Sequence, residues 1–173
     1  MPRDDPRAVP EVDPALGRLR ELAREDLPEL QALFERCGDY FALHEGRPPA
    51  PDEAEADWDL MPAGKPREEK QAFGLYAPGL VAVVDVLRDW RRPGTWTIAL
   101  LLLDPAVRGR GAGTQIVEAV DAWAAAAGAD TLRVVVKLVN PGALAFWQAL
   151  GFRDTPLHYE GLVALERPAR TIV

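Results

Sequence analysis

The sequence predicts a mixed α/β fold, and three features of the chain indicate it. Apolar residues recur at helical spacing in the N-terminal third and at extended spacing after about residue 70. The run Ile98–Leu103 is apolar on both faces, as is typical of a central strand covered on both sides. The chain then continues through alternating helices and strands. This order predicts a sheet with a meander in its middle and helices packed against it.

The N-terminal third is predicted to hold one strand and several short helices. Residues 18–23 alternate as a strand, and Asp26 is a natural N-cap for a helix that ends at Gly38. A short irregular or helical piece at residues 39–46 and a short acidic helix at residues 52–61 follow.

The rest of the chain is predicted to supply the sheet and two longer helices. Glycines end both helices, and valines and leucines dominate the strands. The predicted strands are residues 71–76, 80–87, 95–103, 132–138, 152–156 and 159–165, and the predicted helices are residues 114–127 and 140–150.

Composition limits the class of protein. A chain of 173 residues, 48% of them hydrophobic, suits one domain at residues 17–173 with a polar arm at residues 1–16. A net charge of −7 disfavours nucleic acid as a partner. No apolar run is long enough for a membrane span or a secretory signal, and Cys37 is the only cysteine. We therefore expect a cytoplasmic protein without disulfides.

A glycine-rich turn is the most informative segment of the chain. The apolar strand stops at Asp104-Pro105, two arginines and three glycines follow, and a helix opens near Thr114. Free backbone N–H groups, a helix N-terminus and guanidinium groups then meet at one point, which suits a phosphate. An ordinary strand–turn–helix connection would explain the glycines but not the paired arginines.

Known phosphate-binding motifs differ in how well they fit this turn. A P-loop requires a lysine that is missing here, and the spacing Gly109, Gly111, Gly113 does not match a dinucleotide-binding fingerprint. The pattern Arg-x-x-Gly-x-Gly is met by Arg108, Gly111 and Gly113.

Two separated blocks give the chain a family resemblance. The first is Leu101-x-Leu103-x-Pro105-x-x-Arg108-Gly109-x-Gly111-x-Gly113, and the second is the segment Asn140–Phe152, which ends in Leu-Gly-Phe. With one helix and one strand between them, these blocks resemble the GNAT superfamily of acyl-CoA-dependent N-acetyltransferases. The match covers residues 70–165 well and residues 18–69 by element order.

The resemblance implies a fold and a cofactor site. It implies a mixed, mostly antiparallel sheet with helices on both faces, in which strands 95–103 and 132–138 splay apart around the pantetheine arm of acetyl-CoA, the co-substrate. Guanidinium support for the diphosphate would come from Arg108 or Arg110. The residues implied at the cofactor are Leu101, Leu103, Arg108, Gly109, Arg110, Gly111, Ala112, Gly113, Thr114, Asn140, Phe146 and Trp147.

The catalytic residues are less clearly indicated. The resemblance makes the N–H of Leu103 the contact to the thioester oxygen, where it would stabilise the oxyanion. Where many relatives carry a glutamate base and a tyrosine acid, this chain has Thr97 and Trp147. Asp85 could meet an amine if it faces inward, or could be the solvent-facing half of an alternation. Tyr159 could protonate the sulfur or simply pack.

These observations favour transfer of an acetyl group to a primary amine of a small molecule by direct attack in a ternary complex. Tyr40 and Phe41 could wall the acceptor pocket or belong to the core. The acidic run at residues 52–59 could attract the amine, although a solvated helix face explains it as well. No spacing of His44 and His158 supports a metal site. Acetylation of a protein lysine or N-terminal amine, and a non-catalytic acyl-CoA-binding module, remain alternatives, and a homodimer is left open.

Overall fold

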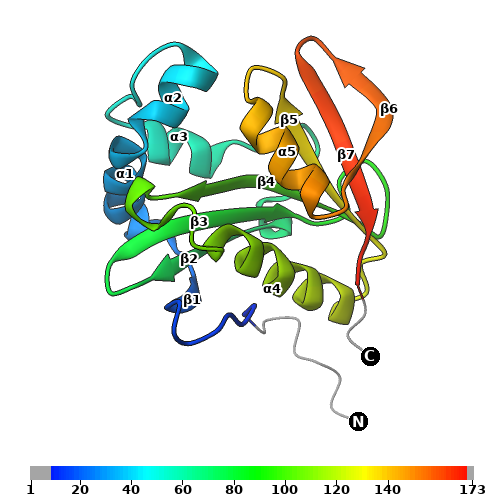
Figure 1. Cartoon of the computed structure of the whole chain (residues 1–173), viewed down its shortest axis with the longest axis horizontal. Helices are drawn as coiled ribbons and strands as arrows, with labels where there is room; N and C mark the ends of the chain where they lie inside the picture. Colours follow the sequence, from blue (N-terminus) through cyan, green and yellow to red (C-terminus); the bar gives the residue numbers. More distant parts are fainter. Residues whose placement is uncertain (1–8, 171–173) are drawn as a thin grey trace.

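A computed structural model describes residues 9–170 of the chain, in which helices cover both faces of one twisted sheet (Figure 1). The helices are α1 (Leu27–Arg36), α2 (Gly38–Glu45), α3 (Glu53–Asp59), α4 (Ala112–Ala126) and α5 (Pro141–Ala149). The strands are β1 (Arg18–Glu21), β2 (Lys70–Tyr76), β3 (Leu80–Leu87), β4 (Thr95–Leu103), β5 (Thr131–Lys137), β6 (Arg153–Tyr159) and β7 (Leu162–Pro168). The predicted mixed α/β class is confirmed.

The sheet has seven strands within the described residues, in the order β1-β2-β3-β4-β5-β7-β6. Neighbouring strands are antiparallel except for β4 and β5, which run parallel because α4 connects them. The sheet is therefore mixed and mostly antiparallel, as the resemblance implies.

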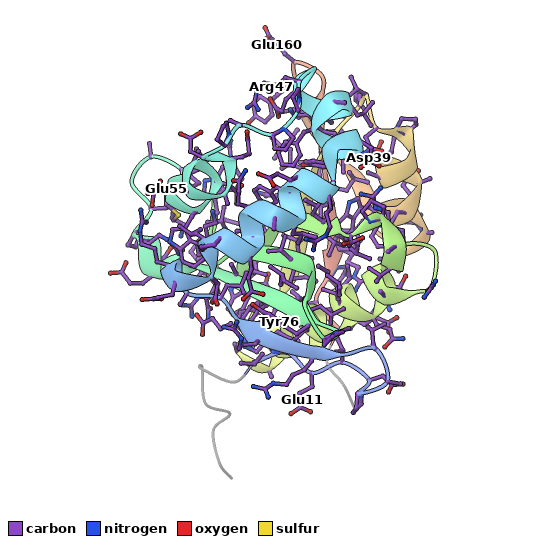
Figure 2. The ribbon with its side chains drawn as sticks, turned by 90° about the vertical axis from the view of Figure 1, so that its left-hand side faces the viewer. Glu11, Asp39, Arg47, Glu55, Tyr76 and Glu160 are labelled. Carbon is purple, nitrogen blue, oxygen red and sulfur yellow. The ribbon has the colours of Figure 1, made fainter. Side chains whose placement is uncertain are left out.

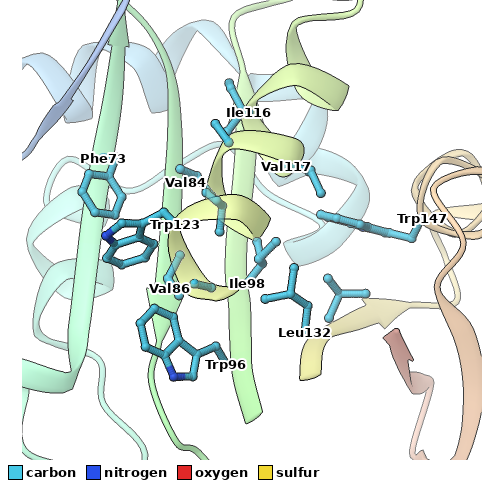
Figure 3. Packing of buried hydrophobic residues seen from close by; sticks show 14 of the residues in the cluster. Phe73, Val84, Val86, Trp96, Ile98, Ile116, Val117, Trp123, Leu132 and Trp147 are labelled. Carbon is cyan, nitrogen blue, oxygen red and sulfur yellow. The ribbon is translucent and has the colours of Figure 1, made fainter. Parts of the chain in front are cut away.

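Two hydrophobic clusters hold the helices against the sheet. On one face, the apolar stripe of α4 and Trp147 of α5 pack onto alternate residues of the central strands. Figure 3 shows this cluster, in which the Trp123 ring lies 5.0 Å from the rings of both Phe73 and Trp96. On the other face, α1, α2 and α3 bury a second cluster that includes Leu33, Phe34 and Phe41. Both faces of β4 are therefore covered, which accounts for its apolar sequence.

Several element boundaries differ from the sequence prediction. Helix α4 begins at Ala112 instead of Thr114, so the glycine turn leads directly into its first turn. Asp26 does not cap α1, because its carboxylate binds Arg20 and the N–H of Ala23. The last hairpin is shifted along the chain, and Tyr159 ends β6 instead of opening the final strand.

The start of the described chain is attached to the main core. Residues 1–8 of the predicted arm lie outside the described residues, whereas Val9, Val12 and Leu16 pack against the cluster under α4. Between residues 9 and 170, none of the helices is long and apolar enough to cross a bilayer.

Candidate functional site

Strands β4 and β5 separate partway along their length. They pair only between Thr95–Ile98 and Thr131–Val134. Beyond that point β4 remains paired only with β3, and β5 remains paired only with β7. The other edge of β4 and of β5 therefore faces the gap between them. A register shift after Asp85 leaves Ala99 as an extra residue on β4, and such a bulge bends the strand. The splayed strand pair is therefore present.

The separation opens a cavity of about 810 Å³ that reaches both faces of the sheet. Helix α2 supplies walls on one face, whereas the turn after β4, the start of α4 and helix α5 supply walls on the other. The lining residues used below are Asp39, Tyr40, Leu43, His44, Leu100, Leu101, Leu102, Leu103, Arg108, Gly109, Gly111, Ala112, Gly113, Thr114, Lys137, Asn140, Phe146 and Trp147. Two molecules could thus approach one point from opposite sides.

The glycine turn presents unhindered backbone to this cavity. Gly109 and Gly111 have φ values of 75° and 82°, which disfavour residues with a Cβ, and a Cβ on either would meet nothing within 4 Å. Gly111 is the N-cap of α4, so the amides of Ala112, Gly113 and Thr114 in the first turn lack helical partners. A Cβ on Gly113 would lie 3.4 Å from Cζ of Phe146, so this glycine allows α4 and α5 to pack closely.

The two arginines of the turn have different surroundings. The Arg108 guanidinium donates to the Leu103 carbonyl at 2.9 Å and to both carboxylate oxygens of Asp39. It lowers the pKa of Asp39 by hydrogen bonding. Figure 2 labels Asp39 near the start of α2, beside the turn after β4. The exposed Arg110 has no side-chain partner among residues 9–170, but it is not one of the residues that line the cavity, whereas Arg108 is.

The amide of Leu103 faces the gap between the strands. In the β3–β4 ladder, the N–H of Asp104 bonds to the carbonyl of Val81. Because hydrogen-bonding groups alternate along an antiparallel strand, the N–H groups of Leu101 and Leu103 point away from β3, toward β5. Arg108 and the thiol of Cys37 both donate hydrogen bonds to the carbonyl of Leu103, and the N–H of Leu103 lies on the cavity side.

A polar contact across the mouth of the cavity was not predicted from the sequence. Asn140 caps α5 by accepting from the N–H of Ala143 at 3.0 Å, and its amide nitrogen lies 3.0 Å from Nε2 of His44. Because the cap orients the amide, the Asn140 nitrogen donates and His44 Nε2 accepts, which places the imidazole proton on Nδ1. The His44 ring also stacks on Tyr40, with centroids 4.0 Å apart. The sequence signal for this stacking was the spacing of four residues between Tyr40 and His44, which places both side chains on one helix face.

These groups are neutral at neutral pH. Burial lowers the pKa of His44, and the nearby Lys137 ammonium lowers it further. Burial, with the charges of Asp57 and Glu45, raises the pKa of Tyr40 to about 12. The cavity therefore contains a neutral imidazole and a neutral phenol beside each other. His44 can accept a proton, whereas Tyr40 keeps its own.

Two residues considered for catalysis lie outside the lining of this cavity. Asp85 is buried, with 3% of its surface exposed, which excludes the solvent-facing alternative, and it is paired with Lys70 at 3.5 Å. Tyr159 is 51% exposed, and its hydroxyl accepts a hydrogen bond from Arg91 at 3.1 Å. The structure therefore does not bring either side chain to Leu103.

The aromatic pair predicted near the cofactor does line the cavity. Trp147 is 7% exposed and packs edge-on against Phe146 and Phe152, with centroids 5.0 and 5.2 Å away. These contacts hold the indole as part of the wall. Within residues 9–170, no cluster of three or more metal-ligating side chains is found.

Comparisons with known proteins agree with this architecture. A solved acetyltransferase from Thermus thermophilus aligns with a TM-score of 0.74 at 28% identity, covering 88% of this chain and 98% of that one. The ribosomal-protein-S18-alanine N-acetyltransferase from Escherichia coli aligns with a TM-score of 0.65 at 17% identity, covering 90% and 95%. An N-acetyltransferase from Staphylococcus aureus gives 0.63 at 18% identity, covering 88% and 98%.

A search of curated proteins found no significant match. The family model described as the acetyltransferase (GNAT) family matches residues 27–152, which include both helices α1 and α4 and the whole glycine turn. With the splayed strands, the turn and this match together, the chain belongs to the GNAT family of acetyltransferases.

Proposed function

We propose that the protein transfers an acetyl group from acetyl-CoA to the primary amine of a small molecule, by direct attack in a ternary complex. The observation that carries the proposal is the cavity between β4 and β5, because it is open to the glycine turn on one face and to α2 on the other. A donor and an acceptor can therefore be present together, as direct transfer requires.

The residues present fit the cofactor. The amides that follow Gly111, at the N-terminus of a helix, suit a diphosphate, and Arg110 adds a positive charge at the turn. The unpaired edge of β4 at Leu101 and Leu103 offers backbone groups to the amides of a pantetheine arm, in the manner of an added strand. Acetyl-CoA, when bound, would supply an activated thioester.

The chain's own groups would assist the transfer in two ways. The N–H of Leu103, on the cavity side, would donate to the thioester oxygen as negative charge develops there. His44 is neutral and lines the cavity; an arriving ammonium would displace the Asn140 amide from Nε2 and give its proton to that nitrogen, so that a neutral amine attacks. Asp85 and Tyr159 lie outside the lining and are not proposed to take part in the transfer.

A thiol-release assay with acetyl-CoA tests the proposal. Release is expected with small primary amines and is expected to be lost in Gly111→Val, because the added side chain would stand where the phosphates approach. Gly64→Val is the matched control: its φ is 80°, its Cβ would also meet nothing within 4 Å, and it lies far along the chain from the turn. Comparable loss in both variants would indicate backbone strain instead.

The two alternatives are distinguished in the same assay. Release with lysine-containing or N-terminal peptides, and not with small amines, would favour a protein acetyltransferase. Binding of coenzyme A in calorimetry without release to any amine would favour a non-catalytic acyl-CoA-binding module.

A further inference from the structure

The half of the cavity under α2 has apolar walls. Leu100 and Leu102 belong to the face of β4 that α1, α2 and α3 cover. Opposite them α2 contributes the rings of Tyr40 and His44, and Leu43, which is 48% exposed, stands at the rim. Aromatic and aliphatic surface therefore makes up most of the space that an acceptor would enter from this side.

The charged side chains lining the cavity are already paired. Among the described residues of the lining they are Asp39, Arg108 and Lys137. Asp39 is bound by Arg108, and Lys137 donates to Glu45 at 2.9 Å and to the carbonyl of His44. The described part of the lining thus offers no uncompensated carboxylate to a bound cation.

The polar groups of this half are concentrated at one place. His44 Nε2 and the Asn140 amide meet at the mouth of the splay, and the Tyr40 ring stacks on the imidazole. All three side chains are uncharged at neutral pH. One amine can hydrogen-bond to these groups. A second ammonium elsewhere in the compartment would lose its hydration without gaining a counter-charge.

We propose that the compartment bounded by Tyr40, Leu43, Leu100 and Leu102 selects a monoamine with an apolar or aromatic body, and discriminates against polyamines and other polycationic acceptors. This inference rests on the proposed function. The acidic run of α3 does not provide the missing counter-charge, because none of its carboxylates lines the cavity: Glu53 pairs with Arg47, Glu55 and Asp59 pair with Arg24, and Asp57 turns inward toward Asp85 and Lys70.

A matched pair of acceptors tests the inference. Heptylamine and hexamethylenediamine have nearly the same length and differ at one end, which is a methyl group in one and an ammonium in the other. We expect kcat/KM for heptylamine to exceed that for the diamine by about tenfold or more. Phenethylamine is expected to resemble heptylamine, and spermidine to resemble the diamine.

Placing a carboxylate in the wall should weaken this preference. Leu43→Glu is expected to shift the diamine-to-monoamine ratio of kcat/KM by about fivefold or more toward the diamine, with an unchanged KM for acetyl-CoA. Leu60→Glu is the control, because Leu60 is 70% exposed at the end of α3 and outside the lining.

The outcomes distinguish a failure of the acceptor preference from a failure of the acetyltransferase function. A wild-type preference for the diamine, or a ratio that Leu43→Glu leaves unchanged, would overturn the inference while the acetyltransferase function stands. Absence of thiol release with every amine, in protein that binds coenzyme A, would overturn the proposed function and this inference with it.

Discussion

Arg108 illustrates how far a motif predicts the role of a residue. The spacing of Arg108, Gly111 and Gly113 predicted the turn, and Gly111 has the open backbone that the pattern indicates, whereas Gly113 packs against Phe146. The partner of the Arg108 side chain is Asp39, 69 residues earlier in the chain. Local spacing carries no information about such a contact, so the sequence alone could not distinguish Arg108 from Arg110 as the phosphate ligand.

The two arginines should therefore differ when they are removed. Arg110→Ala is expected to weaken binding of coenzyme A about fivefold, as befits one exposed charge-assisted contact of roughly 1 kcal/mol, and to leave binding of pantetheine unchanged. Arg108→Ala is expected to weaken binding of both ligands equally, because the Arg108 guanidinium holds the Leu103 carbonyl and Asp39 of α2 by hydrogen bonds. Isothermal titration calorimetry with the two ligands measures this. A loss confined to coenzyme A in Arg108→Ala would restore Arg108 as the phosphate ligand.

Helix α3 shows that sequence can predict an element without predicting the contacts of its side chains. The sequence predicts an acidic helix at residues 52–61, and the structure has one at Glu53–Asp59. Its exposed carboxylates pair with arginines, but Asp57 turns inward, where it meets Asp85 of β3 and Lys70 of β2. Helical periodicity predicts which residues share a face. It does not predict that a carboxyl on β3 and one on α3 will be buried together.

This buried cluster should make stability depend on pH. Burial, followed by the charge of Asp57, raises the pKa of Asp85 to about 7, although Lys70 opposes the shift. In the unfolded chain this carboxyl ionises near its ordinary pKa of 3.8. Between these values the unfolded state releases a proton that the folded state retains, so the free energy of unfolding falls as pH rises from about 4 to about 7, by on the order of a few kcal/mol.

Asp85→Asn is expected to flatten this dependence, because the amide does not ionise. Urea unfolding at several pH values between about 5 and 8 measures the slope. Asp59→Asn is the control on α3, since Arg24 lowers the pKa of Asp59 and its titration lies below this range. A slope that persists in Asp85→Asn would show that another group causes it.

At the scale of the whole molecule, the order of the elements was predictable and the shape of the site only partly so. The apolar strand, the glycine turn and the helix after residue 140 were predicted from sequence, and the resemblance supplied the splay of β4 from β5. The contact of His44 with Asn140 spans 96 residues and depends on how α2 lies over the gap. Only the assembled fold shows that one cavity opens to both faces.

A cavity open to both faces has a kinetic consequence. If donor and acceptor occupy it together, initial rates plotted against each substrate at fixed levels of the other should give intersecting lines. A mechanism in which the enzyme itself carries the acetyl group would give parallel lines. The group that would most readily carry it is the thiol of Cys37, the only cysteine in the sequence.

Cys37 is unsuited to that task in this fold. It is fully buried, its thiol donates to the Leu103 carbonyl at 3.3 Å, and burial raises its pKa, so the nucleophilic thiolate is disfavoured. Cys37→Ala is therefore expected to retain kcat within about twofold, at a temperature where a thermal melt shows it folded, and to keep the intersecting pattern. Parallel lines in the wild type, together with an acetyl adduct on Cys37 by mass spectrometry, would contradict direct transfer, because the cavity would then have to serve donor and acceptor in turn.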